Sequence, residues 1–211
     1  MLTLGISTSS GQFALVMGEN GTVIFNSEDY QLAENKDVDV LISACLGKTG
    51  KSPGDITNIL VDIGPGGTSR VRTGIAFANS LSYSLGIPVC PVSSMELAGL
   101  DAWENYALPV IATVKSISGN AYIGFYNDHQ LKGIRYGTIK EVVPELVSGL
   151  DGFAVVGYHR EQIISLFPDK KVIDSGCLYG SVRILIEKID LFKDRALIFP
   201  RIALPITEKT I

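Results

Sequence analysis

The chain has 211 residues, a net charge of −4 at pH 7, 46% hydrophobic residues and 19% charged residues. This length and composition can bury a core in one domain or in two small joined lobes, and they exclude a disordered chain. The acidic balance disfavours strong direct binding to nucleic acid, because proteins that bind nucleic acid alone normally carry a basic face.

The sequence shows no targeting or membrane feature. Residues 1–12 lack the basic start and the continuous apolar run of a signal peptide, and no stretch reaches the roughly 20 apolar residues of a membrane helix. The three cysteines, Cys45, Cys90 and Cys177, are widely separated and odd in number, which is typical of reduced thiols. We therefore expect a cytoplasmic protein that does not associate with membranes.

The first half predicts three short strands followed by alternating helices and strands. Asn20-Gly21 is a strong hairpin signal, and the apolar spacing after residue 37 indicates one helical face. Ser69 is expected to cap a long helix that ends before Gly86 and Pro88. The predicted strands are 2–6, 12–17, 22–26, 59–63 and 89–92, and the predicted helices are 37–46, 69–85 and 94–103.

The second half repeats this order of elements. It predicts strands at 109–114, 120–126, 131–139, 153–157 and 172–174, and helices at 140–147, 161–167 and 176–189. A duplicated unit of this type is the layout of the actin/Hsp70/sugar-kinase (ASKHA) superfamily. We therefore predict an α/β ASKHA-like fold with an N-terminal actin-like lobe at 1–106 and a smaller, abbreviated actin-like lobe at 107–211.

The most distinctive segment is a Gly- and Pro-rich turn between a predicted strand and a predicted helix. Backbone N–H groups in such a turn and at a helix start can face an anion. No Lys-Ser/Thr pair follows, so this is not a Walker A loop. A phosphate-loop-like site and a sharp connection without a ligand are both compatible with the pattern. The residues concerned are Gly64, Pro65, Gly66, Gly67 and Ser69.

Residues 59–100 resemble the TsaB family, through the Gly-Pro-Gly turn, the Arg72-Thr73-Gly74 step and the Pro-Val-Ser-Ser run at 91–94. The resemblance implies a non-catalytic scaffold subunit that dimerises with a TsaD-type catalytic paralogue in tRNA threonylcarbamoyladenosine biosynthesis. It also implies contact with a TsaE-type ATPase through the complex and a homodimer when the subunit is alone. No cofactor is implied, beyond a weakly bound nucleotide at the subunit boundary.

Two departures from the superfamily pattern argue against catalysis by this chain. Ser7 stands at the end of the first strand, where the superfamily usually places an Asp that helps to hold a metal-nucleotide, and a hydroxyl brings no negative charge to magnesium. The catalytic relatives carry a His-x-x-x-His metal pair, whereas His129 and His159 are far apart in this sequence. We therefore expect no catalytic residue and no metal site.

The predicted helix at 69–85 has two features that bear on partners. Gly74, Ala78 and Ser82 share one face, where small residues let another helix approach closely. In the TsaB family, this helix and the preceding one join the subunit to TsaD or to itself. Dense packing inside the domain is the alternative. The expected interface residues are Val71, Arg72, Gly74, Ile75, Ala78, Leu81 and Ser82, with Val38, Leu41, Ile42 and Cys45.

Other functions remain compatible with the sequence. The Gly-rich loop leaves open an ATP-binding phosphotransferase of the same superfamily, and the helix face allows a drifted paralogue that acts as a self-associating homodimer. A peptidase is disfavoured, because neither His129 nor His159 lies in a recognisable triad or metal arrangement.

Overall fold

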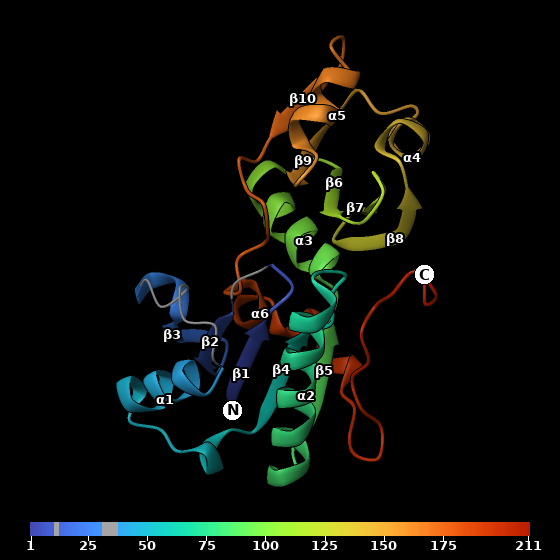
Figure 1. Cartoon of the computed structure of the whole chain (residues 1–211). Coiled ribbons are helices and arrows are strands. Elements are labelled where there is room, and N and C mark those ends of the chain that lie inside the picture. Colours follow the sequence, from blue (N-terminus) through green and yellow to red (C-terminus); the bar gives the residue numbers. More distant parts are fainter. Residues whose placement is uncertain (11–12, 31–37) are drawn as a thin grey trace. The chain divides into compact units, whose positions relative to one another are not determined.

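The computed structural model describes residues 1–10, 13–30 and 38–211 (Figure 1). They form two compact units: unit 1 is Met1–Ser93 with Val182–Pro205, and unit 2 is Ser94–Ser181 with Ile206–Ile211. This division differs from the predicted lobes 1–106 and 107–211, because a helix that starts at residue 94 packs on the second sheet and a C-terminal segment returns to the first.

Unit 1 is built on a mixed sheet of five strands in the order β3-β2-β1-β4-β5. Strand β1 pairs antiparallel with β2 and parallel with β4, which in turn pairs parallel with β5. The predicted hairpin turn is confirmed, since Asn20 and Gly21 have φ of 52° and 82°, as a type I′ turn requires. The strands are β1 (Leu2–Ser7), β2 (Ala14–Glu19), β3 (Thr22–Asn26), β4 (Asn58–Asp62) and β5 (Val89–Val92).

Helices lie on both faces of the unit 1 sheet. The helices α1 (Val38–Thr49) and α2 (Thr68–Leu85) share one hydrophobic core with the sheet. On the other face lies the short helix α6 (Ile184–Glu187), which approaches closely because Gly5 and Gly18 have no side chain to hold it away. The predicted starts at Gln12 and Asp37 lie outside the described residues.

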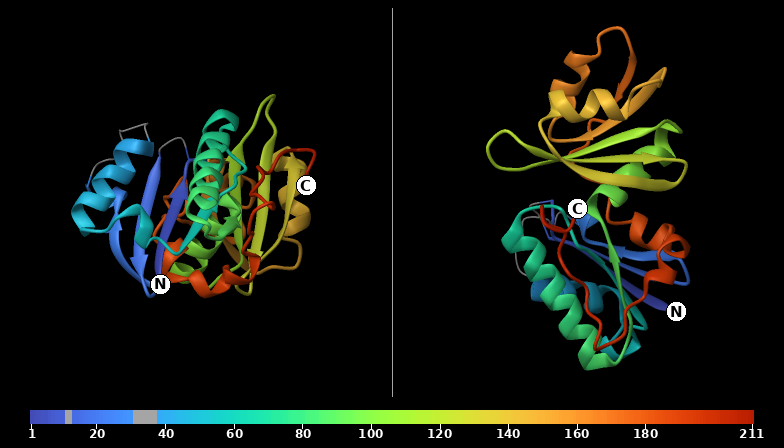
Figure 2. Two further views of the ribbon diagram at one scale, coloured as in Figure 1. Left: turned by 90° about the horizontal axis from the view of Figure 1, so that it is seen from below. Right: turned by 90° about the vertical axis from the view of Figure 1, so that its right-hand side faces the viewer.

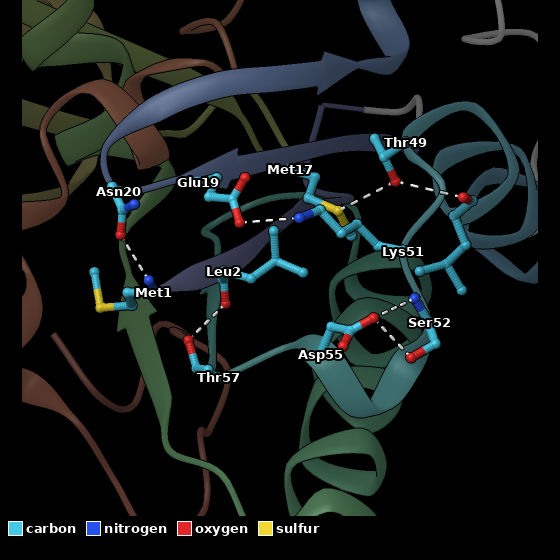
Figure 3. A network of polar contacts seen from close by, with 11 residues as sticks. Met1, Leu2, Met17, Glu19, Asn20, Thr49, Lys51, Ser52, Asp55 and Thr57 are labelled. Carbon is cyan, nitrogen blue, oxygen red and sulfur yellow. Dashed lines mark hydrogen bonds and ion pairs between the residues drawn. The ribbon is translucent and has the colours of Figure 1, made fainter.

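Polar contacts join the chain at the end of unit 1 where β1 begins (Figure 3). The Met1 amine donates to Asn20 Oδ1 at 2.6 Å, and Lys51 Nζ lies 2.9 Å from Glu19 Oε1. The Thr57 hydroxyl donates to the Leu2 carbonyl at 2.8 Å. The short 3-10 turn η3 (Pro53–Asp55) leads from this network into β4. Further 3-10 turns are η1 (Ser27–Tyr30), η4 (Ile189–Leu191) and η5 (Lys193–Arg195).

Unit 2 repeats the topology of unit 1. Its sheet has the order β8-β7-β6-β9-β10, in which β6, β9 and β10 are parallel and β7 and β8 antiparallel. The predicted duplicated fold is therefore confirmed. The strands are β6 (Val110–Lys115), β7 (Ala121–Asn127), β8 (Gln130–Gly137), β9 (Gly152–Gly157) and β10 (Lys171–Asp174), and the helices are α3 (Ser94–Tyr106), α4 (Ile139–Leu146) and α5 (Arg160–Leu166).

The C-terminal helix predicted at 176–189 is much shorter in the structure. Only Ile184–Glu187 is α-helical. Gly176 has a φ of 69°, and Gly180 lies so close to α3 that a Cβ would sit 2.6 Å from the Leu97 carbonyl carbon. The preceding residues therefore run as an irregular segment against α3, and the helical spacing of the sequence is overridden by this contact.

The segment after η5 lies along α2 in unit 1 (Figure 2). Leu197 forms a two-way backbone bridge with Val89 of β5. The Asn79 side chain both donates to the Ala203 carbonyl and accepts from its N–H, each at 3.0 Å. The Asn79 side chain thus makes the two hydrogen bonds that the backbone of a neighbouring strand would make, and it fixes the segment against α2.

Candidate functional site

The connection from β4 to α2 is organised around a buried carboxylate, Asp62. The Ser7 hydroxyl donates to Asp62 Oδ2 at 2.7 Å, and the Ser9 hydroxyl donates to the same oxygen. The Gly64 N–H donates to Asp62 Oδ1 at 2.8 Å. Burial raises the pKa of Asp62, and the hydrogen bonds from Ser9, Ser7 and Gly64 only partly oppose that rise.

The Gly- and Pro-rich turn packs closely on the segment that follows β1. A Cβ at Gly66 would lie 2.6 Å from the Ser9 carbonyl oxygen, so glycine is needed for this approach. The Gly64 carbonyl accepts from the Ser93 hydroxyl at 3.1 Å, and Gly64 itself has a φ of 84°. Gly64 and Pro65 are buried, Gly66 is half-buried, and Gly67 and Ser69 are exposed.

This arrangement bears on the predicted phosphate-loop-like turn. The first amide of the turn, Gly64 N–H, points at Asp62 and not at solvent. Sequence reasoning missed Asp62 as a site residue. The available signal was a charged residue placed directly after the apolar run Ile59–Val61 and before Gly64, which predicts a buried carboxylate that must find hydrogen-bond donors.

The start of α2 differs from the prediction. Ser69 is not the cap; the N-cap residue is Gly67, which has no side chain, and Ser69 is the second residue of the helix. Thr8 lies against the first turns instead. Its hydroxyl donates to the Arg70 carbonyl at 2.8 Å, and Gly74 packs directly on it.

Most predicted interface residues are part of the core of unit 1. Gly74, Ala78 and Ser82 do share one face, but that face points at the sheet, where the small side chains let α2 approach β1 and β4. Of the other predicted residues, Arg72 is exposed, and Ile42 and Leu81 are partly buried against the core. The buried members of the predicted set are Val38, Leu41, Cys45, Val71, Gly74, Ile75, Ala78 and Ser82.

The surface that α1 and α2 turn away from the sheet carries many small side chains, beside larger exposed ones such as Arg70 and Tyr83 of α2. The exposed residues recur at spacings of three and four, so each helix presents a narrow outer stripe. We call these residues the outer face: Ser69, Arg72, Thr73, Ala76 and Ser80 of α2, with Val40, Ser43 and Gly47 of α1.

The two histidines lie in separate parts of unit 2. His129 lies in the turn between β7 and β8, with Nδ1 3.8 Å from Glu104 Oε1 and its ring against Trp103. His159 precedes α5, and its Nδ1 is 3.2 Å from Gln162 Oε1. Within 1–10, 13–30 and 38–211, no three His, Cys, Asp or Glu side chains gather into a group that could hold a metal ion. None of the helices described is long and apolar enough to cross a membrane.

With this geometry established, comparison with known proteins identifies the family. A family model described as TsaD, tRNA N6-adenosine threonylcarbamoyltransferase, matches residues 31–169, which is more than half of the chain. The chain belongs to this TsaD family, as a TsaB/YeaZ-like member. The TsaB resemblance predicted from the segment 59–100 is confirmed by this match together with relatives that are named TsaB.

The relatives include proteins named as tRNA threonylcarbamoyladenosine biosynthesis protein TsaB. The one from Bacillus subtilis (strain 168) is 28% identical over 149 residues, which cover 69% of this chain and 61% of that protein. The one from Escherichia coli (strain K12) is 28% identical over 150 residues, which cover 70% of this chain and 64% of that protein. The chain thus spans about three fifths of the length of these relatives.

Two solved structures from Pseudomonas aeruginosa share the fold. A crystal structure of an uncharacterized protein with similarity to peptidase YEAZ has a TM-score of 0.78, 17% identity and 98% coverage of both chains. A structure of YeaZ has a TM-score of 0.74 and 16% identity, and covers 98% of this chain and 99% of that one. At this identity the likeness concerns the fold alone, and it agrees with the duplicated topology described above.

Proposed function

We propose that this chain is the non-catalytic subunit that binds a TsaD-type transferase subunit in tRNA threonylcarbamoyladenosine biosynthesis. The observation that carries the proposal is the family match, together with relatives named as TsaB biosynthesis proteins. Since the matched relatives act in a pathway that also contains a transferase of the same family, a related subunit is the partner that best fits the chain.

The shape of unit 1 supports this role. The outer face lies on two helices, α1 and α2, which pack on the same sheet through one hydrophobic core. Small side chains such as Ala76 and Ser80 on that face allow the close approach of a helix from another subunit. We therefore place the partner interface on the outer face, where Arg72 is the predicted interface residue that remains exposed.

The absence of catalysis is part of the proposal. Ser7 gives its hydroxyl hydrogen bond to Asp62, and the oxygens of Asp62 accept three hydrogen bonds from this chain. A carboxylate committed in this way is poorly placed to bind magnesium, which prefers carboxylate oxygens, phosphates and water. We expect no binding of ATP to this chain alone in a calorimetric titration, and tight binding would favour the phosphotransferase alternative.

The decisive experiment is size-exclusion chromatography with light scattering on this chain mixed with the TsaD-type protein of the same genome. We expect one peak at the heterodimer mass. Ala76→Trp should weaken that complex by about 30-fold or more, as expected at the centre of an interface. The matched control is Ser165→Trp, which places the same side chain on the exposed surface of α5 in unit 2. Two separate peaks for the unaltered chain would refute the proposal.

Two further outcomes test the remaining partners. The chain alone should run as a concentration-dependent homodimer that Ala76→Trp disrupts, because the same outer face is then left to pair with itself. A TsaE-type ATPase should join the peak only when the TsaD-type protein is present. A homodimer that persists after the TsaD-type protein is added would favour the drifted, self-associating paralogue.

A further inference from the structure

We propose that Asp62, Ser7 and Ser9 are positioning residues that hold the start of α2 in the orientation presented to a partner. The effect on partner binding rests on the proposed function, whereas the effect on α2 does not. The proposal concerns a buried group that the family match leaves without a role.

One carboxylate connects two segments that are distant in the sequence. Asp62 Oδ2 accepts from the hydroxyls of Ser7 and Ser9, which end and follow β1, and Oδ1 accepts from Gly64 N–H in the turn before α2. The side chain of Asp62 is buried. Ser7 and Gly64 are buried too, whereas Ser9 is half-buried. Loss of the carboxylate would therefore leave the Ser7 hydroxyl and the Gly64 N–H as buried donors without a partner.

The carboxylate is held by hydrogen bonds and not by an ion pair. Its electrostatic environment contains the donors Ser9, Ser7 and Gly64, and none of the Lys, Arg or His side chains in the described part of the chain forms an ion pair with it. Such a group costs free energy to bury. Its presence at the junction of two segments indicates a specific role in joining them.

The segment held by Asp62 in turn contacts α2. Ser9 packs against Gly66 at a distance that excludes any side chain there. Thr8 donates to the Arg70 carbonyl and lies against Gly74. The contacts thus run from Asp62 through residues 7–9 to the first two turns of α2, whose N-cap Gly67 supplies no side-chain cap.

Two substitutions at one position separate a positioning role from simple packing. Asp62→Ala removes the acceptor for all three donors. Asp62→Asn keeps the size, still accepts from Gly64 N–H through Oδ1, and can donate to the Ser7 and Ser9 hydroxyls, which accept as well as donate. We therefore expect Asp62→Asn to preserve the connection that Asp62→Ala breaks.

The test is amide hydrogen exchange on the whole chain without a partner. Asp62→Ala should speed exchange in residues 64–74 by about tenfold or more, the effect expected from the loss of hydrogen bonds to a buried acceptor, whereas Asp62→Asn should stay close to the unaltered chain. The control is Asp55→Ala. Asp55 Oδ2 accepts from the Ser52 N–H at 2.7 Å and from its hydroxyl at 2.8 Å in the exposed turn η3 (Figure 3), so its loss should speed exchange only near 52–56.

The same variants are then titrated with the TsaD-type protein. Asp62→Ala should weaken binding by about tenfold, although Asp62 does not belong to the outer face. Asp62→Asn should bind like the unaltered chain. Unchanged exchange in 64–74, or an equal increase across all strands of unit 1, would overturn the positioning role. If the unaltered chain does not bind the TsaD-type protein, the proposed function fails while the exchange result still decides the inference.

Discussion

Units 1 and 2 have the same strand order but differ in the helices that cover their sheets. Helix α2 has 18 residues and α1 has 12, whereas the corresponding α5 and α4 have 7 and 8. Both sheets are nonetheless covered by a continuous hydrophobic core. A short helix is therefore sufficient to cover a sheet of this topology, and the long helical surface of unit 1 points to a role beyond its own core.

The two units also differ in the hydrogen bonds at the carboxyl ends of their central strands. In unit 1 the Asp62 carboxylate joins the end of β1 to the turn after β4. In unit 2 the Thr113 hydroxyl of β6 accepts from His159 N–H at 3.1 Å and donates to the Val156 carbonyl at 3.3 Å. In unit 2 a hydroxyl, that of Thr113, connects the ends of these strands. The fold itself therefore does not require a buried carboxylate at this position.

The largest effect is expected at Gly157, the last residue of β9 in unit 2, where there is no room for a side chain. Gly157 has a φ of 108°, and a Cβ there would overlap the Thr113 carbonyl. Gly157→Ala should lower the free energy of unfolding by about 3–5 kcal/mol. Gly149 also has a positive φ, of 79°, but open space around it, so Gly149→Ala should cost only about 1–2 kcal/mol. Urea denaturation measures both, and equal losses would show that the close contact at Gly157 is relieved.

A smaller effect, with opposite signs at two sites, is expected in the helices of unit 1. Gly74→Ala should lower the free energy of unfolding by about 1–3 kcal/mol, because a Cβ there would overlap Thr8. Gly47 in α1 has open space at its Cβ position, so Gly47→Ala should raise the free energy by about 0.5–1 kcal/mol through helix propensity alone. Thermal denaturation of both variants tests the pair. A stabilising Gly74→Ala would show that α2 is not packed tightly on the segment after β1.

The smallest and most specific effect concerns pH. Burial raises the pKa of Asp62 above its unfolded value of about 3.9, so the folded state binds its proton more tightly. The stability contributed by the protonated form is complete below the unfolded pKa and is lost as pH rises through the folded pKa. The free energy of unfolding of the unaltered chain should therefore fall relative to that of Asp62→Asn as pH rises from the unfolded pKa through the folded pKa.

The exposed Asp55 provides the opposite case in the same unit. Hydrogen bonds from the Ser52 N–H and hydroxyl lower the pKa of Asp55. Its contribution is present above the unfolded pKa and is lost as pH falls through the folded pKa. Urea denaturation across a pH series measures the free energy of unfolding of the unaltered chain minus that of each variant. This difference should fall with pH for Asp62→Asn and rise with pH for Asp55→Asn. If that difference stays flat or rises with pH for Asp62→Asn, the raised pKa of Asp62 is contradicted.

Local signals in the sequence predicted local structure well. The strands at 22–26 and 89–92 have the predicted bounds, and the hairpin at Asn20-Gly21 has the backbone conformation that its residues favour. The long helix that ends before Gly86 also begins within one residue of its predicted start. In each case the propensity, the turn residue and the hydrophobic spacing agree, so tertiary contacts reinforce the local preference.

The failures concern which neighbour a residue meets. The spacing of Gly74, Ala78 and Ser82 correctly grouped them on one face, but a small-residue face can pack inside its own unit as well as on a partner helix. Here all three are buried within unit 1, and Gly74 packs on Thr8 after β1. The segment 176–183 carries apolar residues at spacings compatible with a helix, yet Gly180 packs against the backbone of α3. Periodicity determines which residues share a face, and it does not determine what that face contacts.

The sequence by itself determined the order of the elements, the duplicated α/β topology and the family, because these follow from short-range patterns and from a motif contained in one stretch, 59–100. Only the tertiary structure decided that Ser7, Ser9 and Gly64 all donate to Asp62, that the outer face of α1 and α2 is distinct from their buried faces, and that residues 182–205 return to unit 1. The hydrogen bonds from Ser7 and Ser9 to Asp62 join residues more than 50 positions apart, and such contacts are set by how the sheets and helices pack against each other.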